Sequence, residues 1–85
     1  MIYFNSYNEF DRYKFTGKIH FCIKHDNAIC FYYGDDKENV LDNVNGPARI
    51  SLKTGELEYY LNYSYVGRNL SNKDFNKIIK KIIFE

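Results

Sequence analysis

The sequence predicts an α+β fold: an antiparallel β-meander of four or five strands with one C-terminal helix packed on the sheet. Apolar and polar residues alternate through 18–33 and through 48–61, which is the period of strands buried on one face. A helical period of apolar residues occurs only after residue 70. The 85 residues, 45% of them hydrophobic, allow a single domain, with the meander over about 1–66 and the helix over about 71–84.

Two short strands are expected before the first hairpin. Residues 1–4 have the composition of an edge strand. Tyr13 and Phe15 indicate a further strand over 10–16. Thr16-Gly17 follows this segment as a turn signal, so the chain is expected to reverse there and enter the hairpin.

The first hairpin is expected over residues 18–33. A three-residue loop at 25–27 sets Phe21 opposite Phe31 and gathers the apolar side chains on one face, whereas a two-residue turn mixes that face with Lys24. Register follows burial, so the sequence favours the three-residue loop. The same register places Cys22 directly opposite Cys30 on the other face.

The second hairpin is expected over residues 48–61. A turn at Thr54-Gly55 sets Leu52 against Leu57 on the apolar face and sends Arg49 and Glu58 to the polar face. The stretch before it, residues 34–47, is polar and acidic and is predicted to be a long loop.

The C-terminal helix has a capping residue and an apolar stripe. Ser71 is a favourable N-cap, and Asp74 lies three residues later in capping-box position. One stripe at helical spacing is formed by Phe75, Ile78, Ile79, Ile82 and Ile83. Four lysines lie off the stripe: Lys73, Lys77, Lys80 and Lys81. The stripe is expected to hold the helix on the sheet, because each large apolar side chain contributes about 1.5–3 kcal/mol when buried.

Charge and composition exclude several classes. The net charge of +1 indicates neither a strongly basic nucleic-acid binder nor an acidic nucleic-acid mimic, although an acidic middle (25–58) is followed by a basic tail (59–85). The sequence has no apolar run of membrane-spanning length and does not start like a signal peptide. Two cysteines are too few for a disulfide scaffold, so we expect a cytoplasmic protein with reduced thiols.

Three groups of side chains contain residue types that are used in metal binding or catalysis. His20, Cys22, His25 and Cys30 contain zinc-ligand types, but their spacing matches no standard zinc motif, which favours two unconnected thiols. A Cys22–His20 nucleophile pair lacks a third orienting group. The acidic loop 35–42 lacks EF-hand spacing, which favours a solvated loop. We therefore expect no enzyme activity, no cofactor and no metal.

Parts of the chain resemble the MORN-like β-hairpin repeats of small phage and bacterial proteins, which read roughly NGKxH…GPA…YYLNGK. The matching stretches are Thr16-Gly17-Lys18-Ile19-His20, Asn45-Gly46-Pro47-Ala48, and Glu58-Tyr59-Tyr60-Leu61-Asn62. Residues 70–77 resemble the short closing helix of such proteins. Tyr63 stands where the repeat has Gly, and is expected to add an aromatic side chain in place of a tight turn. The resemblance implies hairpins without catalytic residues.

The leading functional prediction is a non-catalytic protein-binding module. Tyrosines beside charged residues are typical of interface hot spots, and the expected partner-binding residues are Arg49, Glu58, Tyr60, Tyr63 and Tyr65. The resemblance implies a phage-encoded inhibitor of a bacterial enzyme or defence complex, of the anti-CRISPR kind, acting in the cytoplasm of the bacterial host.

Two alternatives to this function stay open. The first is a small nucleic-acid-binding protein that uses the tyrosine cluster with Lys73, Lys77, Lys80 and Lys81. The second is self-association as a homodimer, since an edge strand with exposed tyrosines favours pairing of two copies.

Overall fold

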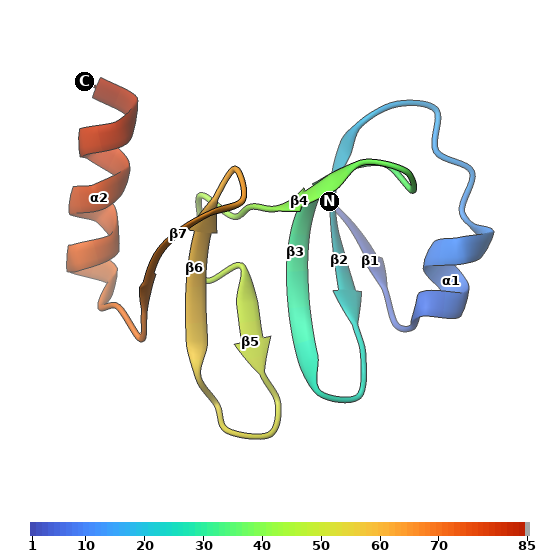
Figure 1. The fold of residues 1–85 in the computed structure, drawn as a ribbon, viewed down its shortest axis with the longest axis horizontal. Coiled ribbons are helices and arrows are strands. Elements are labelled where there is room, and N and C mark those ends of the chain that lie inside the picture. The colour runs from blue at the N-terminus through green and yellow to red at the C-terminus, as the bar shows by residue number, and fades with distance from the viewer. Residues whose placement is uncertain (85) are drawn as a thin grey trace.

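The fold is α+β, with a mixed and mostly antiparallel sheet and a C-terminal helix (Figure 1). The computed structural model describes residues 1–84, and the side chains of residues 1–82. Within this range the sheet has seven strands, more than the four or five expected. The elements are β1 (Ile2–Phe4), α1 (Tyr7–Arg12), β2 (Ile19–Lys24), β3 (Ala28–Gly34), β4 (Asn39–Leu41), β5 (Arg49–Ser51), β6 (Leu57–Leu61), β7 (Ser64–Arg68) and α2 (Asn72–Phe84).

The N-terminal segment is a strand followed by a helix. β1 is the predicted edge strand, but it runs parallel to β2, because α1 carries the chain back before β2 begins. The strand expected over 10–16 is wrong, since a helix covers Tyr7–Arg12. Ser6 caps this helix by accepting a hydrogen bond from the Glu9 N–H at 3.3 Å. The Glu9 carboxylate in turn accepts from the Asn5 N–H at 2.9 Å, so a local capping arrangement overrides the strand propensity of the aromatic residues.

Aromatic rings form the core between α1 and the sheet. Phe4 is 5% exposed and Phe21 is fully buried. The rings of Phe10 and Phe15 pack on Phe21 with centroids at 5.4 and 5.5 Å. We call the side of the sheet that carries these rings the α1 face and the other side the reverse face.

The first hairpin has a different register from the one expected. Phe21 is opposite Tyr32 and Cys22 is opposite Phe31, and the His25 N–H donates to the Ala28 carbonyl at 2.9 Å. The loop is therefore a two-residue turn. The expectation assumed that one face of the hairpin is apolar, whereas both faces bury side chains, since α1 covers Phe21 and the other side buries Cys22.

The segment 34–47 contains a strand and is not one long loop. β4 pairs with residues 32–34 of β3, and β5 pairs with residues 28–30 of the same strand. Two short strands therefore share one position in the sheet, beside β3 (Figure 1). This sharing and the parallel β1 make the sheet more complex than the simple meander that the sequence predicts.

The second hairpin is shifted by two residues from the expected register, and a further strand follows it. Arg49 is opposite Glu58 and Ile50 is opposite Leu57. The turn is longer than Thr54-Gly55, because the Ser51 N–H donates to the Glu56 carbonyl and closes a four-residue loop. A shift of two residues keeps each side chain on its expected face. β7 then extends the sheet beyond the strand end that the sequence predicts.

Large and small side chains alternate in one row across the reverse face. Register places Tyr3 beside Cys22, Cys22 beside Phe31, and Ala48 beyond Phe31, where the Phe31 N–H donates to the Ala48 carbonyl. Cys22 is 3% exposed and Ala48 is fully buried. Since the short side chains lie between aromatic rings, they are shielded without a helix above them.

The helix α2 contacts the sheet through its first turn. The Phe75 ring, 4% exposed, packs on Tyr59 with centroids at 4.8 Å, and the Tyr59 hydroxyl donates to the Leu70 carbonyl at 3.0 Å. Gly67 allows this approach, because a Cβ there would lie 2.9 Å from a Leu70 methyl carbon. The expected packing of the whole stripe on the sheet is wrong, since Ile82 is 55% exposed and α2 stands beside β7 (Figure 1). The side chain of Ile83 lies outside the described residues.

No helix in the described part of the chain has the length and apolar character needed to cross a membrane.

Candidate protein-binding face

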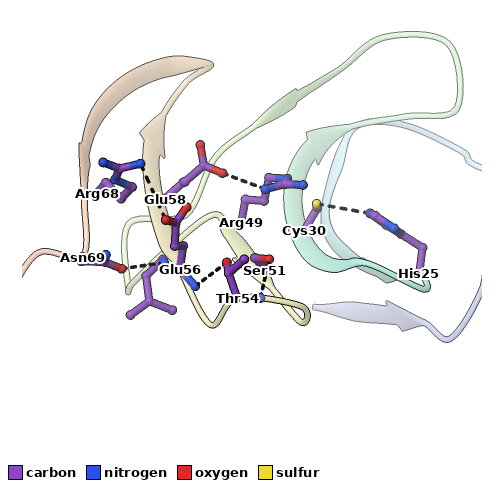
Figure 2. Close-up of polar contacts among 10 residues, drawn as sticks. His25, Cys30, Arg49, Ser51, Thr54, Glu56, Glu58, Arg68 and Asn69 are labelled. Atoms are coloured by element: carbon purple, nitrogen blue, oxygen red, sulfur yellow. Dashed lines mark hydrogen bonds and ion pairs between the residues drawn. The ribbon is translucent and has the colours of Figure 1, made fainter.

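The α1 face changes character from one side of the sheet to the other. Beneath α1 it is aromatic, and beyond β3 it carries charged side chains in line across β5, β6 and β7 (Figure 2). Arg49 donates from Nη1 to Glu58 Oε1 at 2.7 Å, with 37% and 24% of the two side chains exposed. Arg68 is opposite Glu58, and its Nη1 lies 3.8 Å from Glu56 Oε1. The result is a row of alternating charge that is half-buried at Arg49 and Glu58 and exposed at Arg68.

The Arg49–Glu58 pair is held by sheet register and by its own charges. The two residues are direct cross-strand neighbours, so their side chains leave the sheet side by side. The hydrogen bond to Glu58 raises the pKa of Arg49 above its ordinary value. Glu58 and partial burial raise the pKa of Tyr60, burial being the larger cause. The row therefore presents a fixed guanidinium and a neutral phenol at neutral pH.

Three tyrosines lie at the upper end of this row. Tyr60 is opposite Tyr65, and their rings meet edge to face with centroids at 5.4 Å. Tyr65 is 55% exposed and Tyr63 is 67% exposed. The structure thus brings Arg49, Glu58, Tyr60 and Tyr65 onto one face, with Tyr63 in the turn at its end.

Tyr63 lies in a tight turn, whereas the sequence predicts an aromatic side chain in place of a tight turn at this position. Asn62 and Tyr63 have φ values of 49° and 71°, both in the left-handed region. A two-residue turn of this kind favours Asn followed by Gly, because a side chain in this region is strained. Two hydrogen bonds hold the turn: the Tyr63 N–H donates to the Leu41 carbonyl and the Asn62 N–H donates to the Asp42 carboxylate, both at 2.8 Å. The surroundings therefore impose a conformation that Tyr alone disfavours.

The lysines of α2 are separate from the tyrosines. Lys73, Lys77, Lys80 and Lys81 are all exposed, and the helix that carries them packs on Tyr59. Tyr59 points to the reverse face, whereas its neighbour Tyr60 points to the α1 face. The helix that carries the lysines therefore contacts the sheet on the side opposite to Tyr60.

The cysteines and histidines pair differently from the expectation. Register places Cys22 and Cys30 on opposite faces, so the expected position of Cys22 directly opposite Cys30 is wrong, and the two thiols are free. His25 Nε2 lies 3.7 Å from Cys30 Sγ (Figure 2), while the His20 ring is tilted against the Tyr33 ring with centroids at 4.7 Å. Burial raises the pKa of the Cys30 thiol and raises that of Cys22 to about 11. Both thiols are protonated at neutral pH, which is the opposite of what a nucleophilic cysteine needs.

Two carboxylates of the acidic segment 35–42 accept hydrogen bonds from backbone N–H groups. Asp35 Oδ1 accepts from the backbone N–H groups of Lys37 and Glu38 at 2.8 Å, and these bonds lower the pKa of Asp35. Asp42 holds the Asn62 turn. Among the residues that the structure describes, no three His, Cys, Asp or Glu side chains gather as metal ligands. The segment acts as a set of turn-stabilising acceptors.

Arg68 belongs to the charged row but was not among the expected site residues. The expected strand ended before it, so its side chain had no predicted position. Gly67 and Asn69 were the available signals, because both are turn-forming residues and they mark the end of a strand. Asn69, at φ 52°, closes β7 by accepting from the Leu57 N–H at 2.8 Å (Figure 2).

Comparison of the chain with protein-family models, curated proteins and solved structures finds no match. The resemblance to MORN-like repeats therefore stays a prediction, and the arguments for function come from the geometry of the chain itself.

Proposed function

We propose that this chain is a non-catalytic protein-binding module whose contact surface is the tyrosine–arginine face, defined as Arg49, Glu58, Tyr60, Tyr63, Tyr65 and Arg68. The observation that carries the proposal is Tyr63, an aromatic side chain 67% exposed at a positive-φ position that Gly would fill without strain. The fold gains little from this ring. Strain retained at an exposed position is typical of a residue kept for contact with another molecule.

The rest of the face has the composition of a protein interface. Tyr and Arg are the residues most enriched among interface hot spots, with Trp, which this chain lacks. The Arg49–Glu58 pair is already formed at 2.7 Å, so binding does not have to order either long side chain. Pre-organised side chains reduce the entropic cost of association.

The experiment uses the full chain as bait in bacterial lysates, with three variants beside the wild type. Tyr60→Ala and Tyr63→Gly remove rings from the proposed face, and Tyr13→Ala removes a 38% exposed ring beside Phe4 of β1, away from this face, as a matched control. A protein retained by the wild type and Tyr13→Ala is purified and titrated against all four chains. We expect both face variants to weaken binding roughly tenfold or more. Equal affinity of all four chains would contradict the proposal.

The finer predictions concern the kind of partner. A phage-encoded inhibitor of the anti-CRISPR kind, in the cytoplasm of a bacterial host, is supported by the resemblance alone. Nucleic-acid binding is the alternative, and salt distinguishes it: affinity for nucleic acid falls steeply with ionic strength, whereas affinity through tyrosine contacts changes little. Titration of single-stranded DNA at low and high salt therefore decides between the two classes.

A further inference from the structure

The chain exposes more surface than a closed monomer of its mass. Its accessible surface is 6086 Å², whereas folded monomers of 10.2 kDa expose about 5,300 Å². The radius of gyration is 13.3 Å, against about 12 Å for a compact domain of this length. The excess of about 800 Å² equals the area that each partner buries in a standard protein–protein interface.

The reverse face of the sheet accounts for this excess of accessible surface. The molecule is only 17 Å thick along its shortest axis, because one sheet carries α1 on one side and α2 beside its edge. Tyr3 is 65% exposed and Tyr33 is 39% exposed on the reverse face. Four apolar side chains on β3, β5 and β6 of the same face are half-buried: Ile29, Phe31, Ile50 and Leu57. This face has the composition of a sheet surface that a helix covers.

The helix α2 has an apolar stripe that its own chain covers only in part. Ile78 and Ile79 are half-buried and Ile82 is 55% exposed, so its apolar stripe is only partly used. The lysines lie on the other side of the helix and stay in water when the stripe is covered. Phe75 and Leu70 anchor the first turn at the β7 side of the sheet, so α2 does not lie across the strands of its own chain (Figure 1).

We propose that two copies of this chain form a two-fold symmetric dimer in which α2 of each copy packs its isoleucine stripe on the reverse face of the other. Both halves of a helix-on-sheet contact are present on one chain, and a two-fold axis forms the contact twice. The net charge of +1 gives little repulsion between copies. The tyrosine–arginine face lies on the other side of the sheet and stays accessible.

The dimensions of the two surfaces agree. The nine residues of α2 that follow Phe75 make about 14 Å of helix, since each residue adds about 1.5 Å. The strands β2, β3, β5 and β6 span about 14 Å, because neighbouring strands lie about 4.8 Å apart. The helix is therefore long enough to cross the apolar part of the reverse face.

The first experiment measures the solution mass of the full chain by sedimentation equilibrium over a wide concentration range. We expect a mass twice the 10.2 kDa of one chain for the wild type. Ile82→Asp should shift the mass to that of one chain, and Lys80→Asp, a matched change on the lysine side of α2, should leave the dimer intact. Circular dichroism confirms that both variants keep the fold. A wild type that stays monomeric throughout would overturn the proposal.

A second variant tests the sheet side of the contact. Tyr3→Asp places a charge on the reverse face at a 65% exposed position, and should also give a monomer. An equimolar mixture of Ile82→Asp and Tyr3→Asp should partly regain the dimer, because one of its two helix-on-sheet contacts joins an unaltered helix to an unaltered face. A dimer that survives Tyr3→Asp, or a mixture that stays fully monomeric, would contradict this arrangement and leave helix-to-helix pairing or another contact instead.

Discussion

Replacing Tyr63 by Gly should make the fold more stable while removing an exposed ring. Tyr63 has φ of 71° and the preceding Asn62 has φ of 49°. A residue with a side chain costs about 1–2 kcal/mol in this region, and Gly costs nothing there. Gly loses about 0.5–1 kcal/mol more conformational entropy on folding, which offsets part of the gain. Because the ring is 67% exposed, little burial is lost, and the net gain is about 0.5–1 kcal/mol.

The assay is thermal unfolding followed by circular dichroism, at a low protein concentration. A gain of this size raises the melting temperature of a domain of this length by roughly 2–8 °C. Tyr63→Ala is the matched control, since it removes the ring but keeps the strained backbone, and its melting temperature should stay close to that of the wild type. A melting temperature of Tyr63→Gly below that of the wild type would show that the ring supports the fold, and the reasoning for a contact role would then fail.

Three further predictions concern stability. Phe75→Ala should lower the free energy of unfolding by about 3 kcal/mol, because the Phe75 side chain is only 4% exposed. Ile82→Ala should lower it by less than about 1 kcal/mol, and urea titrations of dilute protein measure both effects. Equal effects of the two substitutions would refute the docking of α2 through its first turn alone. Asp42→Ala should lower the free energy of unfolding by about 1–2 kcal/mol in the same titrations, because the Asn62 N–H loses its acceptor. Asp42→Asn should recover most of this loss. An Asp42→Ala variant as stable as the wild type would mean that the turn forms without this hydrogen bond. The fold should lose stability as pH rises from 9 to 11, because burial raises the pKa of Cys22 from 9.0 to about 11, so the unfolded chain releases its proton first. Cys22→Ala should reduce this alkaline loss, and an unchanged pH profile of that variant would exclude Cys22 as its source.

The strands with clear alternation and the C-terminal helix could be predicted from the sequence. Ser71 accepts from the Asp74 N–H at 3.1 Å, as its capping position indicates. Arg49, Glu58 and Tyr60 share one face, as expected, because the register error of two residues preserved the side of each residue. For the same reason these expected residues lie on one side of the sheet, even though their cross-strand partners differ from the expected ones.

The remaining features could not be predicted because distant packing decides them. The register of the first hairpin depends on α1, whose rings cover Phe21, and α1 itself was missed because Tyr and Phe favour strands. The Ser6-Tyr7-Asn8-Glu9 segment carries the one local signal for that helix, a capping box. The tight turn at Tyr63 depends on acceptors from Leu41 and Asp42, some twenty residues away, which no local pattern reveals.

Because β4 and β5 share one sheet position, we expect the molecule to unfold as two cooperative units. The aromatic core joins β1, α1, β2 and β3, whereas β5 pairs with β3 through a short ladder at residues 28–30 and β4 through another at residues 32–34. We expect the second unit, which contains β5, β6, β7 and α2, to open as a whole at a lower free energy than global unfolding, so its amide hydrogens exchange faster than those of β2. Since the tyrosine–arginine face lies within this unit, a bound partner should slow amide exchange there first.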